Sequence, residues 1–224
     1  MNILALDTSD EVFSAALLTE NGLWSTEMDS GARHSELLME CVDGLLKYAG
    51  IAQKELNLIA CMRGPGSFTG LRIGFSTAKG LGIALEIPIK AFPTMDCLAR
   101  SLDFWPGIVV PAIDAKKGCF FSALFRGKER LTEDMDASPE TISLEIKKHL
   151  AQINEPVALT GSGAELLIPF LKPVFPSVKL DSRARKGRAR ELIDFAKCGI
   201  LKNSNYMDAG PVYIRKSDAE LNRR

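Results

Sequence analysis

The chain lacks the features that mark several common classes of protein. It has five cysteines, and no two of them form the Cys-x-x-Cys pair of a zinc or redox site. It opens on no secretory leader, and no apolar run reaches the roughly 18 residues that a membrane-spanning helix requires. We therefore expect a soluble cytoplasmic protein with reduced cysteines and no membrane contact.

Net charge is also absent, because 28 Lys and Arg residues balance 28 Asp and Glu residues. A nucleic acid would have to bind at a local patch. The candidate is the basic run Arg183, Arg185, Lys186, Arg188, Arg190. No aromatic residue interleaves with this run to stack on bases, so we favour a solvated loop and helix start. Contact with a phosphate backbone stays open as the alternative.

Histidine is scarce, with His34 and His149 the two examples. His34-Ser35-Glu36 contains the residue types of a hydrolase relay, but consecutive helical residues point about 100° apart and cannot form one. We interpret this cluster as a polar cap in the first turn of a helix, and His149 as solvated. Two isolated histidines do not make a metal site.

What the chain does contain is a glycine-rich segment, RGPGSFTGLRIGFSTAKGLG, over Arg63–Gly82. Gly64-Pro65-Gly66 predicts a tight turn, and a helix starts near Ser67–Thr69, where free N–H groups favour an anion. Each helical glycine costs about 1 kcal/mol relative to alanine. We therefore expect another helix to pack closely on a stripe of small residues, and Gly74→Leu to abolish pairing without unfolding the monomer. The stripe consists of Gly70, Gly74, Ala78, Gly82.

Hydrophobic patterning predicts the element order β-β-β-α-β-α-β-α in the first half. Strands are expected at Ile3–Leu6, Val12–Leu18, Leu23–Met28, Leu58–Met62 and Pro88–Phe92. Helices are expected at His34–Ala49, from about Ser67 to Leu85, and at Thr94–Leu102. The first of these helices has a broad apolar arc that includes Leu37, Cys41, Leu45, Tyr48.

The second half begins in the same way as the first. Ala112-Ile113-Asp114 echoes Ala5-Leu6-Asp7, and Met135-Asp136 echoes Met28-Asp29 at the same spacing. Matched order and spacing predict an internal duplication. The expected fold is α/β and actin-like (ASKHA), with two RNase H-like halves that each carry a mixed sheet flanked by helices. We place the halves at residues 1–104 and 105–224, with the last helix and tail able to pack back on the first half.

Folds of this plan hold a nucleotide between their halves. Asp7 and Asp114 end equivalent strands and are candidates for holding a metal ion or a metal-bound phosphate. The alternative for Asp7 is turn capping, which is the interpretation we favour for Asp114. The full set of candidate nucleotide contacts is Asp7, Thr8, Ser9, Asp114, Gly161, Gly163.

Five motifs in order, ALDTS, RHSELL, GPGSFTGLRIG with AKGLG, AIDAKKG and GPVYIR, resemble the bacterial TsaB (YeaZ) family over nearly the whole chain. The resemblance implies a role in forming threonylcarbamoyladenosine in tRNA, by docking on a catalytic paralogue, TsaD, with an ATPase, TsaE, joining the complex. Where that paralogue carries two metal-binding histidines, this chain has Thr94 and Leu98, which cannot bind iron or zinc as imidazole does. The resemblance therefore implies a scaffold or activator without catalytic residues and without a metal.

Members of the family pair through two helices of the first half. The resemblance therefore places the docking surface on the apolar arc and the stripe, which are Leu37, Cys41, Leu45, Tyr48 and Gly70, Gly74, Ala78, Gly82. We expect a homodimer in isolation that exchanges for a heterodimer with the TsaD-like subunit. Contact with tRNA would be indirect, through the complex. No cofactor is required, and weak ATP or ADP binding stays open.

Three other functions remain as alternatives. An actin-like ATPase or small-molecule kinase would use Asp7, Asp114 and the Gly161–Gly163 turn with Mg²⁺. A peptidase acting on its partner would use the His34-Ser35-Glu36 cluster. An RNase H-like nuclease would need three or four convergent carboxylates for two metals, of which the sequence places two.

Overall fold

The computed structural model describes residues 1–29, 31, 33–152, 154–198 and 210–215. The chain divides into two compact units. Unit 1 comprises Met1–Cys97 and Gly187–Val212, and unit 2 comprises Leu98–Lys186 and Tyr213–Arg224. The chain thus leaves unit 1 and returns to it for helix α6 (Ala189–Cys198).

Unit 1 is built on a mixed sheet in the strand order β3-β2-β1-β4-β5. Strand β1 pairs antiparallel with β2 and parallel with β4, so that Ala5 lies opposite Ala16 and Ala60. Strands β1 and β4 are almost continuously apolar, as is typical of strands buried on both faces. The strands are β1 Ile3–Asp7, β2 Val12–Thr19, β3 Gly22–Asp29, β4 Leu58–Gly64, β5 Ile89–Pro93.

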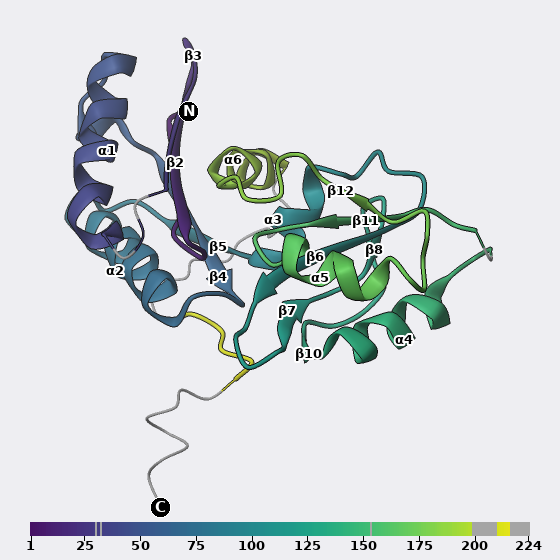
Figure 1. Cartoon of the computed structure of the whole chain (residues 1–224). Coiled ribbons are helices and arrows are strands. Elements are labelled where there is room, and N and C mark those ends of the chain that lie inside the picture. The colour runs from purple at the N-terminus through teal and green to yellow at the C-terminus, as the bar shows by residue number, and fades with distance from the viewer. Residues whose placement is uncertain (30, 32, 153, 199–209, 216–224) are drawn as a thin grey trace, which may run out of the picture. The chain divides into compact units, whose positions relative to one another are not determined.

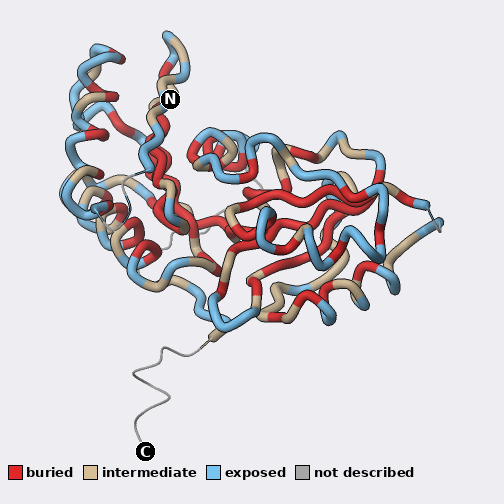
Figure 2. Tube along the Cα trace, in the orientation of Figure 1, coloured by how far each residue is buried: buried red, intermediate tan, exposed pale blue. Residues whose placement is uncertain are grey.

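Helices cover both faces of this sheet (Figure 1). Helices α1 (His34–Ala49) and α2 (Phe68–Leu85) share a core with Leu4 and Leu6 on one face. Helix α6 packs against Ile3 and Ala5 on the other face. Buried residues accordingly run along the strands and along one side of each helix (Figure 2). The short 3-10 helix Gln53–Glu55 precedes β4, and α3 (Thr94–Arg100) follows β5.

Unit 2 repeats this plan with the strand order β10-β7-β6-β11-β12. Strand β6 pairs antiparallel with β7 and parallel with β11, as β1 does with β2 and β4. Its helices are α4 Pro139–His149 and α5 Ala164–Leu171. The strands are β6 Ile108–Asp114, β7 Phe120–Ser122, β8 Phe125–Arg126, β9 Glu129–Arg130, β10 Met135–Ala137, β11 Val157–Thr160, β12 Lys179–Leu180. The repeated order confirms the predicted duplication and the α/β class.

The predicted start of the glycine-rich helix is also confirmed, because Ser67 is its N-cap and accepts a hydrogen bond from the Gly70 amide. The sequence did not reveal the β8–β9 hairpin, since strands of two residues are too short to show an alternating pattern. The last helix is described from Ala189 to Cys198, and residues 199–209 lie outside the described residues. Within the described ranges, no helix is long and apolar enough to cross a membrane.

Candidate functional site

In unit 1, the loop after β1 and the turn after β4 form one hydrogen-bonded structure. Asp7 is buried, and its Oδ1 accepts hydrogen bonds from Ser9 N at 3.0 Å and Ser9 Oγ at 2.6 Å. Ser67 N donates to the Ser9 carbonyl at 2.7 Å. A Cβ added to Gly66 would lie 2.4 Å from that same carbonyl oxygen, so glycine is required there. The glycine turn thus packs against a loop of its own chain where we expected an anion.

The stripe of small residues on α2 is buried, which corrects the prediction that a partner helix packs on it. A Cβ on Gly70 would lie 2.0 Å from the Thr8 carbonyl oxygen, and one on Gly74 would lie 2.3 Å from Thr8 Oγ1. Thr8 Oγ1 also donates to the Gly70 carbonyl at 2.7 Å. The β1–β2 loop therefore supplies the contact that Gly70 and Gly74 need. All four members are buried within unit 1: Gly70, Gly74, Ala78, Gly82.

This contact also overturns our expectation for Gly74→Leu. A leucine side chain at position 74 would have to displace Thr8 from the interior of unit 1. Thr8 is 2% exposed, so there is no solvent-facing space into which either side chain could move. The substitution would disturb the monomer and could not serve as a clean test of pairing.

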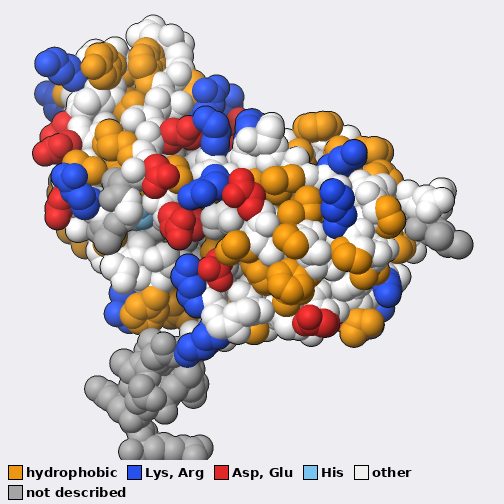
Figure 3. Space-filling model, viewed as in Figure 1, with side chains coloured by type: hydrophobic (Ala, Val, Ile, Leu, Met, Phe, Trp, Pro, Cys, Tyr) orange, Lys and Arg blue, Asp and Glu red, His pale blue; other side chains and the backbone are white. Residues whose placement is uncertain are grey.

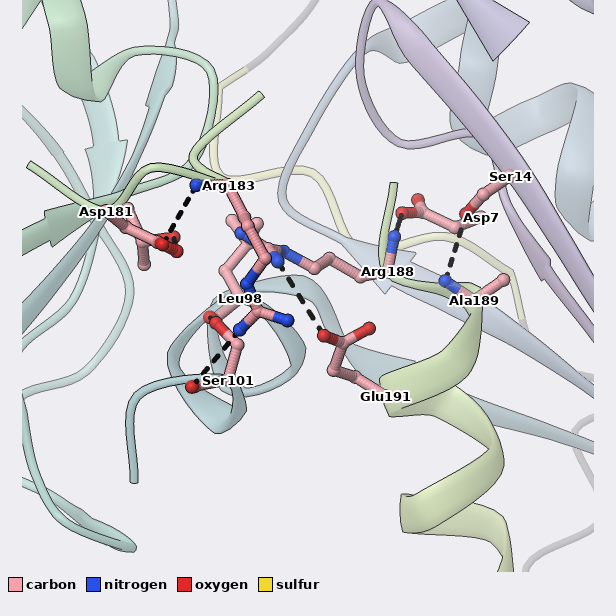
Figure 4. A network of polar contacts seen from close by, with 10 residues as sticks. Asp7, Ser14, Leu98, Ser101, Asp181, Arg183, Arg188, Ala189 and Glu191 are labelled. Carbon is pink, nitrogen blue, oxygen red and sulfur yellow. Dashed lines mark hydrogen bonds and ion pairs between the residues drawn. The ribbon is translucent and has the colours of Figure 1, made fainter. Parts of the chain in front are cut away.

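The second oxygen of Asp7 fixes the start of α6 (Figure 4). Asp7 Oδ2 accepts a hydrogen bond from Arg188 N at 2.8 Å, and Ser14 Oγ accepts one from Ala189 N at 3.0 Å. A Cβ on Gly187 would lie 2.4 Å from the Ser14 side chain, so the chain approaches β2 closely at this point. These contacts support turn capping as the role of Asp7.

The basic run over residues 183–190 does not behave as one solvated segment. Arg188 is 1% exposed, and its Nη1 lies 3.7 Å from the Glu191 carboxylate. Our expectation of a solvated side chain was therefore wrong for Arg188, which lies inside unit 1. The exposed members are Arg183, Arg185, Lys186, Arg190. Their contact with nucleic acid stays a prediction.

Asp114 occupies the equivalent place in unit 2 but has different partners. Its Oδ1 accepts from Lys116 N at 2.7 Å, and its Oδ2 accepts from Lys116 Nζ at 2.8 Å. Partial burial acts to raise the pKa of Asp114, but the hydrogen bonds and charge of Lys116 outweigh burial and hold that pKa below its usual value. Asp114 thus caps its own turn, as we favoured.

The glycine turn after β11 contacts the end of β6 within unit 2. Gly163 N donates to the Ala112 carbonyl at 2.9 Å, and a Cβ on Gly161 would lie 2.3 Å from that carbonyl oxygen. A Cβ on Gly163 would lie 2.8 Å from Asp114 N. Packing therefore accounts for both glycines. Nucleotide contacts by Thr8, Ser9 and these glycines stay predictions.

The His34-Ser35-Glu36 cluster forms no relay. His34 is buried, its Nε2 lies 3.0 Å from the Glu11 carbonyl oxygen, and its ring packs edge-on to Phe13 at 5.2 Å. Glu36 pairs with Arg33 at 3.0 Å. The imidazole thus ties α1 to the β1–β2 region, which is a structural role.

His149 is half-buried, and its Nδ1 lies 2.9 Å from the Glu145 carbonyl oxygen on the same helix. It is therefore less solvated than we expected. Thr94 and Leu98 lie one turn apart on α3, and both side chains are buried. Among the residues that the structure describes, no group of three or more His, Cys, Asp or Glu side chains could hold a metal ion.

The apolar arc of α1 is only partly available to a partner. Cys41 and Leu45 are buried in the core of unit 1, and Leu37 is half-buried. Tyr48, by contrast, is 80% exposed. Of the four predicted interface residues on α1, Tyr48 therefore offers the largest free surface.

Two glycines that the sequence analysis did not consider are open to solvent. A Cβ on Gly44 of α1 or on Gly80 of α2 would meet no atom of another part of the described protein within 4 Å. Gly44 lies one turn before Tyr48, and Gly80 lies one turn before Ile83, which is 66% exposed. Since a helical glycine costs about 1 kcal/mol relative to alanine, a contact outside unit 1 would explain why both positions are glycine. No local pattern in the sequence separates these open glycines from the packed ones.

Comparison with known proteins gives a consistent result. A family model described as TsaD, tRNA N6-adenosine threonylcarbamoyltransferase, matches residues 28–181. The tRNA threonylcarbamoyladenosine biosynthesis protein TsaB of Bacillus subtilis is 32% identical over 222 residues, which is 98% of this chain and 96% of that protein. The similarity therefore extends over both units.

Solved structures agree. A Pseudomonas aeruginosa protein described as having similarity to the peptidase YEAZ superposes with a TM-score of 0.79 at 28% identity, over 96% of this chain and 99% of that one. A Bacteroides thetaiotaomicron protein described as having an actin-like ATPase fold and unknown function gives a TM-score of 0.50 at 12% identity, over 86% and 95% of the two chains. The second likeness concerns the fold alone and supports the actin-like prediction.

Proposed function

The chain belongs to the TsaB (YeaZ) family of tRNA threonylcarbamoyladenosine biosynthesis, and from this premise we propose that it is a non-catalytic scaffold or activator subunit. It docks on a TsaD-like catalytic subunit that bears the reactive metal, and a TsaE-like ATPase joins the complex. Its contact with tRNA is indirect, through that complex. It requires no cofactor of its own.

The use of its polar residues supports a role without chemistry. Both oxygens of the Asp7 carboxylate accept hydrogen bonds within unit 1, from Ser9 and from the start of α6, which is a structural role. His34 is held against the Glu11 carbonyl oxygen. Thr94 and Leu98, at the positions where the family resemblance aligns metal-binding histidines, are a hydroxyl and a hydrocarbon. Neither is an effective ligand for iron or zinc.

The pair of open helical glycines carries the docking proposal. We define the docking face by Leu37, Gly44 and Tyr48 of α1 with Gly80 and Ile83 of α2, two helices that contact one another. Gly44 and Gly80 allow the backbone of a partner helix to come close, and the exposed side chains beside them supply apolar area. In the absence of the catalytic subunit, the same face pairs with a second copy of this chain.

Deleting the gene in its own organism and measuring tRNA nucleosides by mass spectrometry tests this function. Threonylcarbamoyladenosine should disappear while other modified nucleosides persist, and the wild-type gene should restore it. Gly80→Gln, which places a bulky side chain on the docking face, should restore little. Leu144→Gln, at a residue of α4 that is 57% exposed, is the matched control and should restore the modification fully. Normal modification in the deletion strain, or with Gly80→Gln, would contradict the proposal.

A further inference from the structure

The GPVYIR motif, residues 210–215, lies outside the proposed docking face and is the yellow segment near the C-terminus in Figure 1. It has neither helix nor strand, and the division between the two units falls within it, between Val212 and Tyr213. The chain therefore passes from one unit to the other three times, after Cys97, after Lys186 and after Val212. Because the third passage has no secondary structure, the contacts at its two ends decide what it can do.

Val212 is held on unit 1 at the end of β4. Its N–H donates a hydrogen bond to the Arg63 carbonyl at 2.7 Å. A Cβ on Gly64 would lie 2.4 Å from the Val212 carbonyl oxygen and 3.2 Å from Leu71 Cδ1. Gly64 also has a φ of +113°, which L side chains rarely adopt. Glycine at this position therefore leaves the space in which Val212 lies against unit 1.

Arg215 is held on unit 2 by contacts with three of its parts. Its Nε donates to Asp136 Oδ2 at 2.5 Å and its Nη2 donates to Asp136 Oδ1, which makes a bidentate pair with β10. Its Nη1 donates at 2.6 Å to the carbonyl of Ala115, the residue after β6. The guanidinium carbon also lies 5.8 Å from the centre of the Phe121 ring on β7. Arg215 thus fixes the end of the motif at one place on unit 2.

Two residues, Tyr213 and Ile214, separate these two contacts, and both are exposed. Three Cα–Cα steps join Val212 to Arg215, and an extended chain spans about 3.3 to 3.6 Å per residue. While both contacts hold, the Cα atoms of Val212 and Arg215 therefore stay within about 11 Å of one another. Movement elsewhere in the two units cannot change this limit.

We propose that residues 212–215 form a strap that limits how far unit 1 and unit 2 can move relative to one another, with the Arg215 pair as its releasable end. The Arg215 and Asp136 side chains are 25% and 19% exposed, so water can replace their contact when the pair opens. Basic and acidic side chains are interspersed on the face of the molecule shown in Figure 3, which supports an attraction that depends on the pair itself. The strap does not rest on the proposed function, because docking uses unit 1 alone.

The two contacts of the strap act in series. Val212 contacts unit 1, Arg215 contacts unit 2, and the two share no partner. Release of either end frees the strap completely, so release of the second end adds nothing. Two contacts that each stabilise their own unit would instead have additive effects, as is usual for independent sites.

Energy transfer between two fluorophores, measured on single molecules, tests the Arg215 end. The dyes are attached through handles other than cysteine at Lys54 and Lys147, exposed residues of units 1 and 2, and excess unlabelled protein keeps the transfer within one chain. Arg215→Gln should broaden the distribution of transfer efficiencies relative to wild type. Arg130→Gln is the matched control and should not, since Arg130 is also 25% exposed and pairs with Asp134 within unit 2.

The Val212 end supplies the second test. Val212→Pro removes the N–H that donates to Arg63, whereas Val212→Ala keeps it. Val212→Pro should broaden the distribution as Arg215→Gln does, the double variant should broaden it no further, and Val212→Ala should leave it unchanged. A wild-type distribution in Arg215→Gln, equal broadening in Arg130→Gln, or additive broadening in the double variant would overturn the strap.

Discussion

Units 1 and 2 share a strand order but differ in the length of their elements. Helices α1 and α2 have 16 and 18 residues, whereas their counterparts α4 and α5 have 11 and 8. Strand β3 has eight residues and its counterpart β10 has three. The two units therefore have the same topology, but the two helices and the edge strand are long in unit 1 and short in unit 2. The greater length of α1 and α2 supports placing the proposed docking face on unit 1.

The glycine turns, by contrast, have the same role in both units, because each allows a backbone carbonyl to pack closely against the turn. In unit 1, Gly66 leaves room for the Ser9 carbonyl, and in unit 2, Gly161 leaves room for the Ala112 carbonyl. In unit 1 the turn after β4 packs on the loop that follows β1, and in unit 2 the turn after β11 packs on the end of β6. Glycine at these places therefore reflects close internal packing, and glycine at Gly44 and Gly80 does not.

The largest expected effect is the loss of stability in Gly70→Ala. The added methyl would lie 2.0 Å from the Thr8 carbonyl oxygen, which belongs to a buried backbone that cannot move freely. Overpacking of this kind lowers the free energy of unfolding by about 3 kcal/mol. Urea denaturation measures the change. An unaltered unfolding curve would show that Thr8 does not pack on α2 as described.

Glu155→Gln is expected to have the next largest effect, in unit 2. Glu155 is buried and forms a bidentate pair with Arg126 at 2.9 and 3.0 Å, while Ala151 N donates to it at 2.7 Å. Because Arg126 is partly exposed, we expect a loss of about 2 kcal/mol, below the range for a fully buried pair. Thermal or urea unfolding at neutral pH measures it.

The same pair gives a pH dependence with a definite sign. Hydrogen bonding to Arg126 outweighs burial and lowers the pKa of Glu155 from its usual value of 4.5. The stability that this pair contributes is therefore fully present above pH 4.5 and is lost as the pH falls through the lowered pKa of the folded state. Wild-type protein should lose more stability than Glu155→Gln over that acidic range. Parallel losses in the two proteins would contradict the pair's contribution.

Asp7→Asn and Asp114→Asn compare the two equivalent carboxylates. Asparagine at position 7 would present an NH₂ group to a buried backbone or hydroxyl donor, so the free energy of unfolding should fall by about 2 kcal/mol. Asp114 is partly exposed and its partner Lys116 can turn to solvent, so its substitution should cost about 0.5 kcal/mol. Urea denaturation of the two variants, side by side, measures the difference. Equal losses would mean that the two turns are equivalent in energy as well as in topology.

One substitution is expected to have the opposite sign and to stabilise the protein. Gly80→Ala adds a methyl that meets no other part of the described protein, so helix propensity alone should raise the free energy of unfolding by about 1 kcal/mol. Denaturation of this variant beside Gly70→Ala contrasts an open glycine with a packed one on the same helix. Destabilisation by Gly80→Ala would show that position 80 is needed within the monomer.

Much of the fold could be predicted from the sequence, because strands and helices leave local patterns. Echoes such as Ala5-Leu6-Asp7 with Ala112-Ile113-Asp114 sufficed to predict two sheets of one plan, and Ser67 marked the start of α2. These features depend on neighbouring residues and on the period of the hydrophobic pattern.

The site was harder to predict, because its contacts join distant residues. Thr8 and Gly70 are 62 positions apart, and the local sequence around either residue does not predict its contact with the other. Arg188 lies within a basic run, where composition favoured solvent exposure, yet it is buried. Open glycines such as Gly80 could be separated from packed ones such as Gly74 only after the β1–β2 loop had been located.

Affinity for the TsaD-like catalytic subunit of the same organism tests the docking face most directly. Ile83→Gln and Leu144→Gln form a matched pair, since each replaces an exposed apolar helical residue, 66% exposed in unit 1 and 57% in unit 2. Titration calorimetry should show binding weakened at least tenfold by Ile83→Gln and unchanged by Leu144→Gln. Equal affinities for wild type and Ile83→Gln, or a loss confined to Leu144→Gln, would contradict the account.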